Sequence, residues 1–321
     1  MMETTYINRG DRPTKEGFAE GLDEAGKKHK NVVALGADIT ASVGADRFAR
    51  NYPERFFSMG IAEQNCVGVA AGMAFEGKIP VFATYGVFSA LRTTDFIRIS
   101  VCYNQLHVII GGAHAGISVG PDGATHQALE DIAIMRVLPG MTVISPCDAT
   151  QTKLAVMAAV EQAKGPVYLR FGRAPVPDFT DESQEFLIGK ARVMQEGRDL
   201  SIIATGHMLW EALEAHNILK KQGIQARIIN MHTIKPIDEA CIIRAARETG
   251  GIVTAEEHQI TGGLGSAVAE VLAKHMPVPM EMTGMDDSFG ESGQPGELME
   301  KYGMTAGHIV RKALRLLEKR G

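Results

Sequence analysis

The segment from Ser58 to His126 contains three pieces around which the rest of the chain is arranged: Ser58-Met-Gly-Ile-Ala-Glu-Gln-Asn65, Pro80-Val-Phe-Ala-Thr-Tyr-Gly-Val-Phe88 and His114-Ala-Gly-Ile-Ser-Val-Gly-Pro-Asp-Gly-Ala-Thr-His126. Each piece is predicted to lie at the carboxyl end of a β-strand or in the loop that leads into the following helix. In an open α/β sheet, ligands bind at that edge, because loops from neighbouring strands converge there. We therefore expect one crevice to collect the polar and aromatic side chains of these pieces, namely Glu63, Tyr85, Phe88, His114, Asp122 and His126.

The composition is that of an ordinary globular protein. A chain of 321 residues is longer than a single hydrophobic core usually serves, so two domains are expected. The net charge of -5, without a basic block, gives no reason to expect nucleic acid or an anionic membrane as a partner. Residues 1–12 have no apolar run that could serve as a signal peptide, and no apolar run approaches the roughly 20 residues of a membrane helix. We therefore expect a cytoplasmic protein.

The cysteines are widely spaced and include no Cys-x-x-Cys pair. Such spacing is typical of small buried side chains in a reduced protein rather than of a disulfide or zinc framework. The four residues are Cys66, Cys102, Cys147 and Cys241.

Short β-branched runs bounded by Gly or Pro alternate with helical patterns in the first half of the chain. This alternation predicts a parallel sheet with helices on both faces. An amphipathic helix is predicted from Thr14 to about His29, because Phe18, Leu22 and Ala25 share one face. The predicted strands are residues 31–38, 79–84, 106–111, 141–145 and 166–170.

A second α/β domain is predicted after a connection. Residues 174–198 break the alternation with prolines and charges, which is typical of a link between domains. From Asp199 the alternation restarts, with strands predicted at 200–205, 226–230, 251–255 and 278–282 and helices at 209–222, 238–249, 264–275 and 306–319. We therefore predict two three-layer α/β domains with parallel sheets, at residues 1–175 and 199–321, joined by a linker at 176–198.

The helix predicted at residues 61–75 carries unusually little side-chain bulk. Glycine in particular lowers the intrinsic stability of a helix. We therefore expect these small residues to allow a close approach of another backbone, whose packing offsets that loss. Two explanations stay open, which are tight packing on the chain's own sheet and a subunit interface. The small residues are Gly68, Ala70, Ala71, Gly72 and Ala74.

Each candidate residue also has an ordinary structural explanation. A glutamate such as Glu63 in the first turn of a helix is favoured by the helix dipole. Asp122 and Gly123 form a common turn pair. Arg170 and Arg173 are expected either on a solvated surface or, at a sheet edge, as a fork for phosphate. The functional interpretation therefore depends on the order and spacing of the whole set.

The whole set resembles the C-terminal half of transketolase. The matching pieces are GIAEQN, ATYGVFSALR, HAGISVGPDGATHQ, SPCDA and GPVYLRFGR, and the resemblance covers essentially the whole chain. Residues 120–127, Gly-Pro-Asp-Gly-Ala-Thr-His-Gln, are similar to an element specific to transketolases and deoxyxylulose-phosphate synthases, and this separates them from the β subunits of 2-oxoacid dehydrogenases. The resemblance implies a pyrimidine-binding domain of the thiamine diphosphate fold, followed by the family's smaller C-terminal domain with its motif at residues 256–265.

The resemblance assigns cofactor-binding roles to four residues. Glu63 would be the catalytic, cofactor-activating glutamate, which in its protonated form donates to N1′ of the aminopyrimidine ring. Tyr85 and Phe88 would stack on that ring, and Asp38 would also contact the cofactor. A third aromatic residue, usual in many transketolases, falls at Leu91 here, which implies weaker stacking on one side.

The resemblance also implies a substrate site. Asp122 would bind a sugar hydroxyl, and His126 would assist proton movement at the carbonyl that is formed or broken, so both would be catalytic. His114 favours transketolase, because the synthase typically has Arg at this position. The remaining residues of the sugar-phosphate site would be Arg173, Ser42 and Lys15. Lys15 replaces an arginine of many transketolases and lacks the bidentate fork, so looser phosphate recognition or a different anionic group is implied.

One part of a complete thiamine enzyme is missing from the sequence. Such enzymes hold the diphosphate through a metal ion bound by a Gly-Asp-Gly motif, and this sequence contains no such tripeptide. No metal ligands are therefore expected here, and Mg²⁺ or Ca²⁺ would be bound by a separate diphosphate-binding subunit. The resemblance then implies the C-terminal subunit of a split transketolase, active only with an N-terminal partner, in an assembly of two copies of each chain.

Three functions remain open at this point. The first is ketol transfer from a ketose phosphate to an aldose, either in the pentose phosphate pathway or in a specialised sugar route. The second is a subunit of another thiamine enzyme, a deoxyxylulose-phosphate synthase or a 2-oxoacid dehydrogenase. The third is a non-catalytic structural paralogue, since a fold alone does not establish activity.

Overall fold

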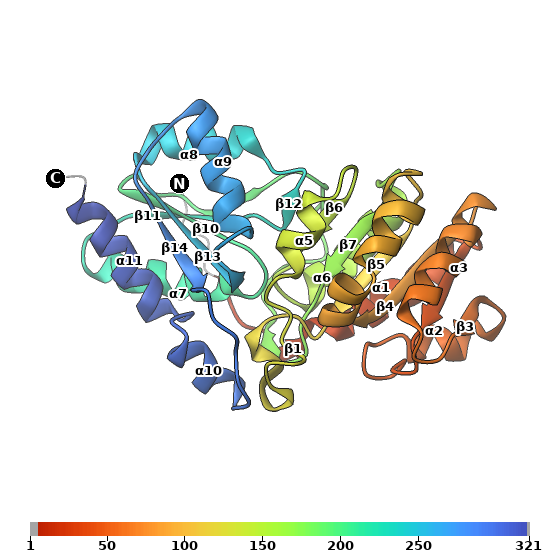
Figure 1. The fold of residues 1–321 in the computed structure, drawn as a ribbon. Coiled ribbons are helices and arrows are strands. Elements are labelled where there is room, and N and C mark those ends of the chain that lie inside the picture. Colours follow the sequence, from red (N-terminus) through yellow and green to blue (C-terminus); the bar gives the residue numbers. More distant parts are fainter. Residues whose placement is uncertain (1–5, 320–321) are drawn as a thin grey trace.

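The computed structural model describes residues 6–319 and contains two α/β units. The first is built on a seven-stranded sheet and the second on a five-stranded sheet. In Figure 1 most of the first unit is coloured red to green and most of the second cyan to blue, while the cyan strand β12 lies beside β6 in the first sheet. The outer ends of the two predicted domains, residues 1–5 and 320–321, lie outside the described residues.

The first sheet has the strand order β12-β6-β7-β5-β4-β2-β3. All neighbouring strands are parallel except β12, which pairs antiparallel with β6 at the edge. The interior strands are apolar along nearly their whole length, because helices cover a parallel sheet on both faces. The strands are β2 (Val32–Gly36), β3 (Phe56–Ser58), β4 (Ile79–Tyr85), β5 (Ile109–Ala113), β6 (Thr142–Ile144), β7 (Val167–Arg170) and β12 (Thr233–Lys235).

The helices of the first unit pack closely on this sheet and on each other. A Cβ atom added at Gly17 of α1 would lie 1.9 Å from the carbonyl oxygen of Ala149, the first residue of α6, so only glycine permits this approach. The helices are α1 (Thr14–Lys28), α2 (Asp46–Asn51), α3 (Glu63–Phe75), α4 (Thr94–Phe96), α5 (Asp131–Val137) and α6 (Ala149–Glu161). Further helical turns lie at Pro53–Arg55, Val87–Arg92, Ile97–Cys102 and Ile117–Asp122.

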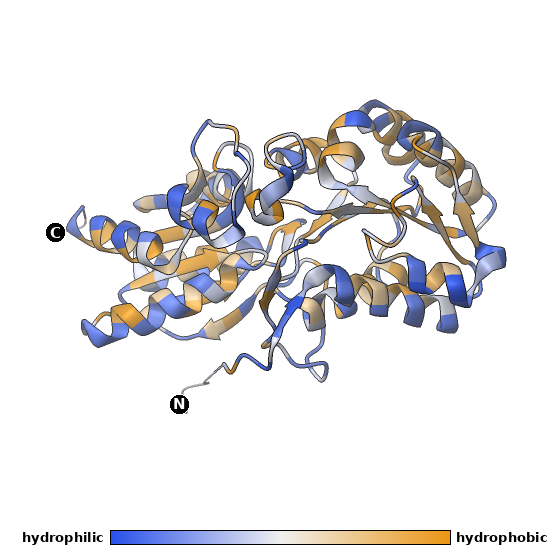
Figure 2. Ribbon diagram, turned by 90° about the horizontal axis from the view of Figure 1, so that it is seen from below, coloured by the Kyte–Doolittle hydropathy of each residue, from blue (hydrophilic) through white to orange (hydrophobic). Residues whose placement is uncertain are grey.

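The second sheet has the order β14-β13-β10-β11-β9, with four parallel strands and the antiparallel strand β9 at one edge. Its strands are β9 (Arg192–Gln195), β10 (Leu200–Ala204), β11 (Ala226–Asn230), β13 (Ile252–Gln259) and β14 (Met280–Met285). Its helices are α7 (Met208–Lys221), α8 (Glu239–Thr249), α9 (Leu264–His275), α10 (Pro295–Lys301) and α11 (Ala306–Glu318). Figure 2 shows apolar strands inside and hydrophilic residues along the outer sides of the helices.

These sheets confirm the predicted α/β class and correct it in one respect. Each unit was expected to contain a parallel sheet, but each has one antiparallel edge strand. Both edge strands are short, and β9 lies within the segment predicted as a linker. A third, two-stranded sheet pairs β1 (Asp11–Pro13) with β8 (Pro175–Pro177). Proline is tolerated in such edge strands, because it lacks a backbone N–H and the outward-facing N–H groups of an edge strand bond to no neighbouring strand.

Arg170 joins the two units and is not the solvated residue that was one expectation for it. Its Nε lies 2.9 Å from Oδ2 of Asp131, and both side chains are buried. Its Nη2 donates to the carbonyl oxygens of Ala128 and of Glu257, the latter in the second unit. The hydroxyl of Tyr168 donates to the same aspartate at 2.8 Å. This buried pair therefore ties β7, the loop before α5 and β13 together.

The four cysteines are buried and free, as predicted. Burial raises the pKa of the Cys66 and Cys102 thiols to about 11.

Within residues 6–319, no helix is both long enough and apolar enough to cross a membrane.

Candidate active site

Four neighbouring strands of the first sheet end at the same edge and supply most of the candidate residues. Tyr85 is the last residue of β4, His114 directly follows β5, and Arg173 lies three residues after β7. Ser42 lies in the loop after β2. Glu63 begins α3. The edge of the sheet predicted from the sequence therefore collects side chains that are far apart in the chain.

Two aromatic rings and two imidazoles form one cluster at this edge. The ring of Tyr85 stacks on His114 with centroids 4.3 Å apart. His126 stands edge-on to Tyr85 at 5.8 Å and to Phe88 at 5.7 Å. Tyr85 and Phe88 are themselves 5.9 Å apart. The cluster thus offers flat apolar faces next to ring nitrogens.

His114 is buried with one ring nitrogen unsatisfied. Its Nε2 lies 3.2 Å from the carbonyl oxygen of Ser42, whose hydroxyl is 2.9 Å from the hydroxyl of Tyr85. Its Nδ1 has no partner within the described residues. Burial lowers the pKa of His114 to about 4, and the charges of Lys15 and Arg173 act in the same direction. The imidazole is therefore neutral near pH 7.

Cationic side chains lie close to this neutral ring. Arg173 pairs with Asp122 through an Nη1 to Oδ1 distance of 2.8 Å and also donates to the carbonyl oxygen of Val119. The charge of Lys15 lowers the pKa of His114, and in the described part of the chain Lys15 forms no ion pair. Two cations beside a neutral imidazole with a free nitrogen make an electropositive corner that favours an anion.

Glu63 is 4% exposed and is held by a residue that the sequence interpretation missed. Arg92 Nη1 lies 2.9 Å from both carboxyl oxygens of Glu63. The guanidinium of Arg92 also lies 4.4 Å from the ring centroid of Phe88, within the range of a cation–π contact. Arg92 follows Phe88 by four residues, which places both on one side of a helical turn, but this common spacing does not by itself mark a functional residue. Glu63 is thus linked to the ring cluster through Arg92.

An open pocket of about 490 Å³ lies beside this pair. Phe88, Leu91 and Arg92 line it from the first unit, and Phe289 lines it from the second. Phe289 is 77% exposed. Its loop is held to the first unit by Gln127, whose Nε2 donates to the carbonyl oxygen of Glu291 at 2.9 Å. No periodicity in the sequence points to Phe289, because only the packing of this loop brings it here.

A carboxylate of the second unit also fixes the loop that carries Asp122. Oε1 of Glu257 accepts from the backbone N–H of Ser118 at 2.5 Å, and Oε2 lies 3.3 Å from Nδ1 of His207. Gly116 has φ +86, and a Cβ atom there would lie 2.2 Å from this carboxyl group. The glycine permits both the turn and the contact. Glu257 belongs to the motif at residues 256–265, but no role was predicted for it from the sequence.

The predicted residue Asp38 is not joined to the cluster by any contact among the described residues. It is exposed, has φ 65 and follows the end of β2. Within residues 6–319 it makes no hydrogen bond or ion pair with the other candidate residues.

Across the described chain, no group of three His, Cys, Asp or Glu side chains is arranged to hold a metal ion.

Two protein-family models match the chain. The model described as transketolase, pyrimidine binding domain, matches residues 11–178, and that described as transketolase, C-terminal domain, matches residues 189–309.

Known proteins similar to the chain carry related names. It is 44% identical over 322 residues to a "putative transketolase C-terminal section" of Methanocaldococcus jannaschii, a match that covers 99% of this chain and 100% of that protein. It is 42% identical over 306 residues to a "6-deoxy-6-sulfo-D-fructose transketolase subunit" of a Clostridium species, covering 95% of each. A solved structure described as "split gene transketolase, inactive beta4 tetramer" superimposes with a TM-score of 0.90 at 47% identity, covering 95% of this chain and 98% of that one.

We expect His114 to titrate near pH 4 rather than near 6.5, because burial and the two neighbouring cations disfavour its charged form. The folded chain then binds this proton less tightly than the unfolded chain. His114 therefore lowers the free energy of unfolding as the pH falls from 6.5 towards 4, and it makes no pH-dependent contribution above pH 6.5. Ring-proton NMR signals followed against pH measure the midpoint, and His114→Asn identifies the signal. A midpoint at the ordinary histidine value would contradict the buried, neutral ring.

Proposed function

This chain belongs to the transketolase family, and we propose that it acts as the C-terminal subunit of a two-chain transketolase. The complete enzyme would transfer a two-carbon ketol unit from an anionic ketose to an aldose acceptor. The observation that carries the proposal is the buried carboxyl of Glu63, linked through Arg92 to the ring cluster of Tyr85, Phe88 and His126. The relatives support the two-chain arrangement, because the chain spans the full length of one described as a C-terminal section.

The pocket suits the pyrimidine half of thiamine diphosphate, the cofactor on which the family depends. Its volume of about 490 Å³ and its walls of Phe88 and Leu91 can receive an aromatic heterocycle, which packs well against flat ring faces. Glu63, paired with the wall residue Arg92, offers a carboxyl group for a ring nitrogen. When bound, the cofactor supplies the carbon nucleophile that carries the ketol unit.

Glu63 would hold a proton on one carboxyl oxygen and share it with N1′ of the pyrimidine. Arg92 donates to both oxygens, so one of these two contacts has to open before the carboxyl group can meet the ring nitrogen. The burial of Glu63 keeps bulk water away from the shared proton. Tyr85 and Phe88 would orient the ring, and Asp38, which is exposed, would contact the cofactor only at its edge.

His126 and Asp122 would act on the sugar. The His126 ring belongs to the cluster, and its Nδ1 lies 2.9 Å from the hydroxyl of Thr125, so its other nitrogen can exchange a proton with the sugar carbonyl oxygen. Asp122 would accept a hydrogen bond from a sugar hydroxyl. Its present partner, Arg173, holds the carboxylate in place at 2.8 Å.

We infer that the electropositive corner of Lys15, Arg173 and His114 receives the anionic end of the ketose, with Ser42 holding the imidazole. Lysine is a point charge without a bidentate fork, so this corner is less selective for phosphate geometry than a pair of arginines. One relative is described as acting on a 6-deoxy-6-sulfo-D-fructose. A terminal sulfonate is therefore a candidate beside a terminal phosphate.

An apolar surface supports docking of an N-terminal partner subunit, which would bind the diphosphate and Mg²⁺ or Ca²⁺. Cβ atoms added at Gly68 and Gly72 of α3 would meet nothing within 4 Å, so another backbone can approach there. Large exposed patches of this kind mark interfaces. We define the α3 face as the exposed residues Phe57, Ile61, Phe75, Leu91, Phe96, Ile99 and Tyr103. A related chain is described as an inactive β4 tetramer, which supports self-association without activity.

With its partner subunit, thiamine diphosphate and Mg²⁺ or Ca²⁺, the chain is expected to transfer ketol units from five-, six- or seven-carbon ketoses that carry phosphate or sulfonate. The chain alone is expected to be inactive, because it supplies only half of the cofactor site. Coupled assays of the released aldose measure this. Release of CO₂ from pyruvate would instead favour a synthase or dehydrogenase, and a stable complex without any turnover would favour a structural paralogue.

Glu63→Gln is expected to lower turnover of the assembled enzyme by roughly 10²–10⁴-fold, since that is the typical contribution of one placed proton-transfer group. Circular dichroism and assembly with the partner should be unchanged. Glu76→Gln is the matched control, because Glu76 is exposed at the other end of the same helix. Normal turnover in the Glu63 variant would refute the assigned role.

Tyr103→Glu is expected to weaken binding of the partner subunit about tenfold or more, because it places a charge in an apolar interface. Tyr103 is 84% exposed in the free chain, so folding should be unaffected. Titration followed by light scattering measures the affinity. Val137→Glu, an exposed apolar residue outside the α3 face, is the control. Equal affinities of the two variants would exclude this face as the docking surface.

A further inference from the structure

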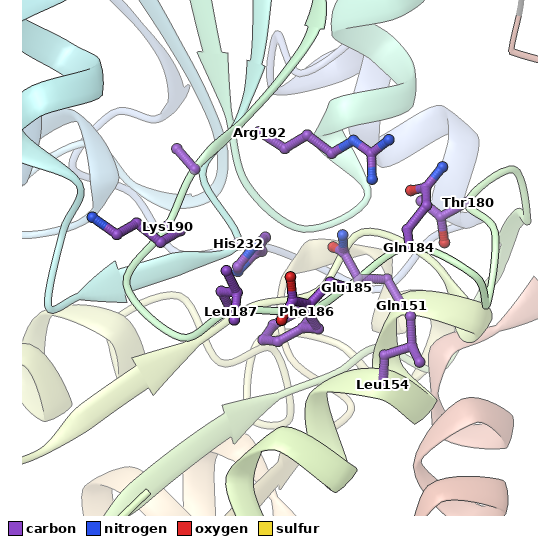
Figure 3. A pocket seen from close by; sticks show the side chains of 11 residues that line it. Gln151, Leu154, Thr180, Gln184, Glu185, Phe186, Leu187, Lys190, Arg192 and His232 are labelled. Atoms are coloured by element: carbon purple, nitrogen blue, oxygen red, sulfur yellow. The ribbon is translucent and has the colours of Figure 1, made fainter. Parts of the chain in front are cut away.

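A second cavity, of about 280 Å³, lies between the two units and shares no lining residue with the candidate active site. Its walls come from α6, from the segment 180–192 between the units, and from His232 just before β12 (Figure 3). Segments of both units therefore meet around it. Nothing in the proposed ketol transfer uses these residues.

Two side chains that are more than nine-tenths buried each place a nitrogen without a hydrogen-bond partner in this cavity. Gln151 is 6% exposed, and its Oε1 already accepts from the N–H of Cys147 and from Nδ2 of Asn230. Its Nε2 has no acceptor within residues 6–319. His232 is 4% exposed, with Nδ1 2.9 Å from the hydroxyl of Thr233, and its Nε2 likewise makes no hydrogen bond in the described chain. Figure 3 shows both side chains at the centre of the lining set.

The rim of the cavity carries two cationic side chains, Lys190 and Arg192. Neither Lys190 nor Arg192 has an ion pair or side-chain hydrogen bond among the described residues, although most basic side chains of this chain do. Figure 3 shows Arg192 on one side of His232 and Lys190 on the other. Glu185 is an acidic residue of the lining, so the rim has a net positive charge.

One wall is flat and apolar. The rings of Phe186 and His232 lie 4.1 Å apart at an angle of 33°. Leu154 and Leu187 extend this wall. A ligand here would meet cations at the rim, the Gln151 amide and the His232 imidazole at the base, and an apolar surface at one side.

We propose that this interdomain cavity binds a small phosphorylated metabolite, with its phosphate at Arg192 and Lys190 and its remaining part against Phe186. Cations without partners attract a dianion, and the guanidinium fork of Arg192 matches two phosphate oxygens. The volume lies at the small end of ligand sites, which fits a metabolite of a few carbons rather than a nucleotide. Because the walls belong to both units, a bound ligand would stabilise their present arrangement.

Inorganic phosphate is the probe, and the full-length chain is measured by isothermal titration in a background that carries both Lys15→Gln and Arg173→Gln. These two substitutions remove both cations of the candidate active site, so the remaining binding reports the cavity alone. Adding Arg192→Gln is expected to weaken this binding about tenfold or more, since it removes a charge-assisted contact. Adding Arg198→Gln, a highly exposed arginine that does not line the cavity, should leave it unchanged.

Each outcome decides one proposal. Phosphate binding that survives Lys15→Gln with Arg173→Gln and is lost with Arg192→Gln supports the cavity. Binding that disappears in the Lys15→Gln, Arg173→Gln background leaves the active-site proposal standing and overturns this one. Equal affinities after Arg192→Gln and Arg198→Gln also overturn it, because binding would then be a general effect of surface charge. All substituted side chains are partly or largely exposed, so folding should be retained.

Discussion

The buried pair of Arg170 and Asp131 is the constraint on which the arrangement of the site depends. Arg170 donates at the same time to Asp131, to the carbonyl of Ala128 and to the carbonyl of Glu257 in the second unit. Breaking one side of such a pair leaves an uncompensated buried charge, which costs about 3–5 kcal/mol. Glu257 in turn accepts from Ser118 in the loop of the candidate residues. The Arg170 guanidinium thus joins the second unit to the segment before α5, next to the contact that holds that loop.

Much of the fold could be predicted, because local hydrophobic patterns in the sequence indicate most of its helices and strands. The first helix was expected from Thr14 to about His29 and spans Thr14–Lys28. The buried parallel strands were recognised as apolar runs, although β5 begins at Ile109 rather than at residue 106. The antiparallel edge strands could not be recognised. A strand of three or four residues has too few positions for a pattern, and its partner is selected by packing between distant segments.

The sequence predicted the site only through the order and spacing of several short motifs, because no single residue identified it. The expectation that their side chains share one crevice fits the contacts among Tyr85, His114 and His126. Arg92 and Phe289 were not found, because an arginine in a helical turn and an aromatic residue in a loop have no distinctive local pattern. Their importance comes from what packs against them. Asp38 was suggested by resemblance alone, and no contact of the described chain joins it to the cluster.

The strand β12 has a consequence for how this protein can be divided. It is encoded after β11 of the second sheet, yet it completes the edge of the first sheet beside β6. A gene fragment that stops after residue 178 would leave the β6 edge uncovered, and bare strand edges template aggregation. The fragment that begins after residue 178 would contain β12 without its pairing partner β6. The two units are therefore separate in architecture but not modular, and domain exchange between homologues has to carry β12 together with the sheet that it completes.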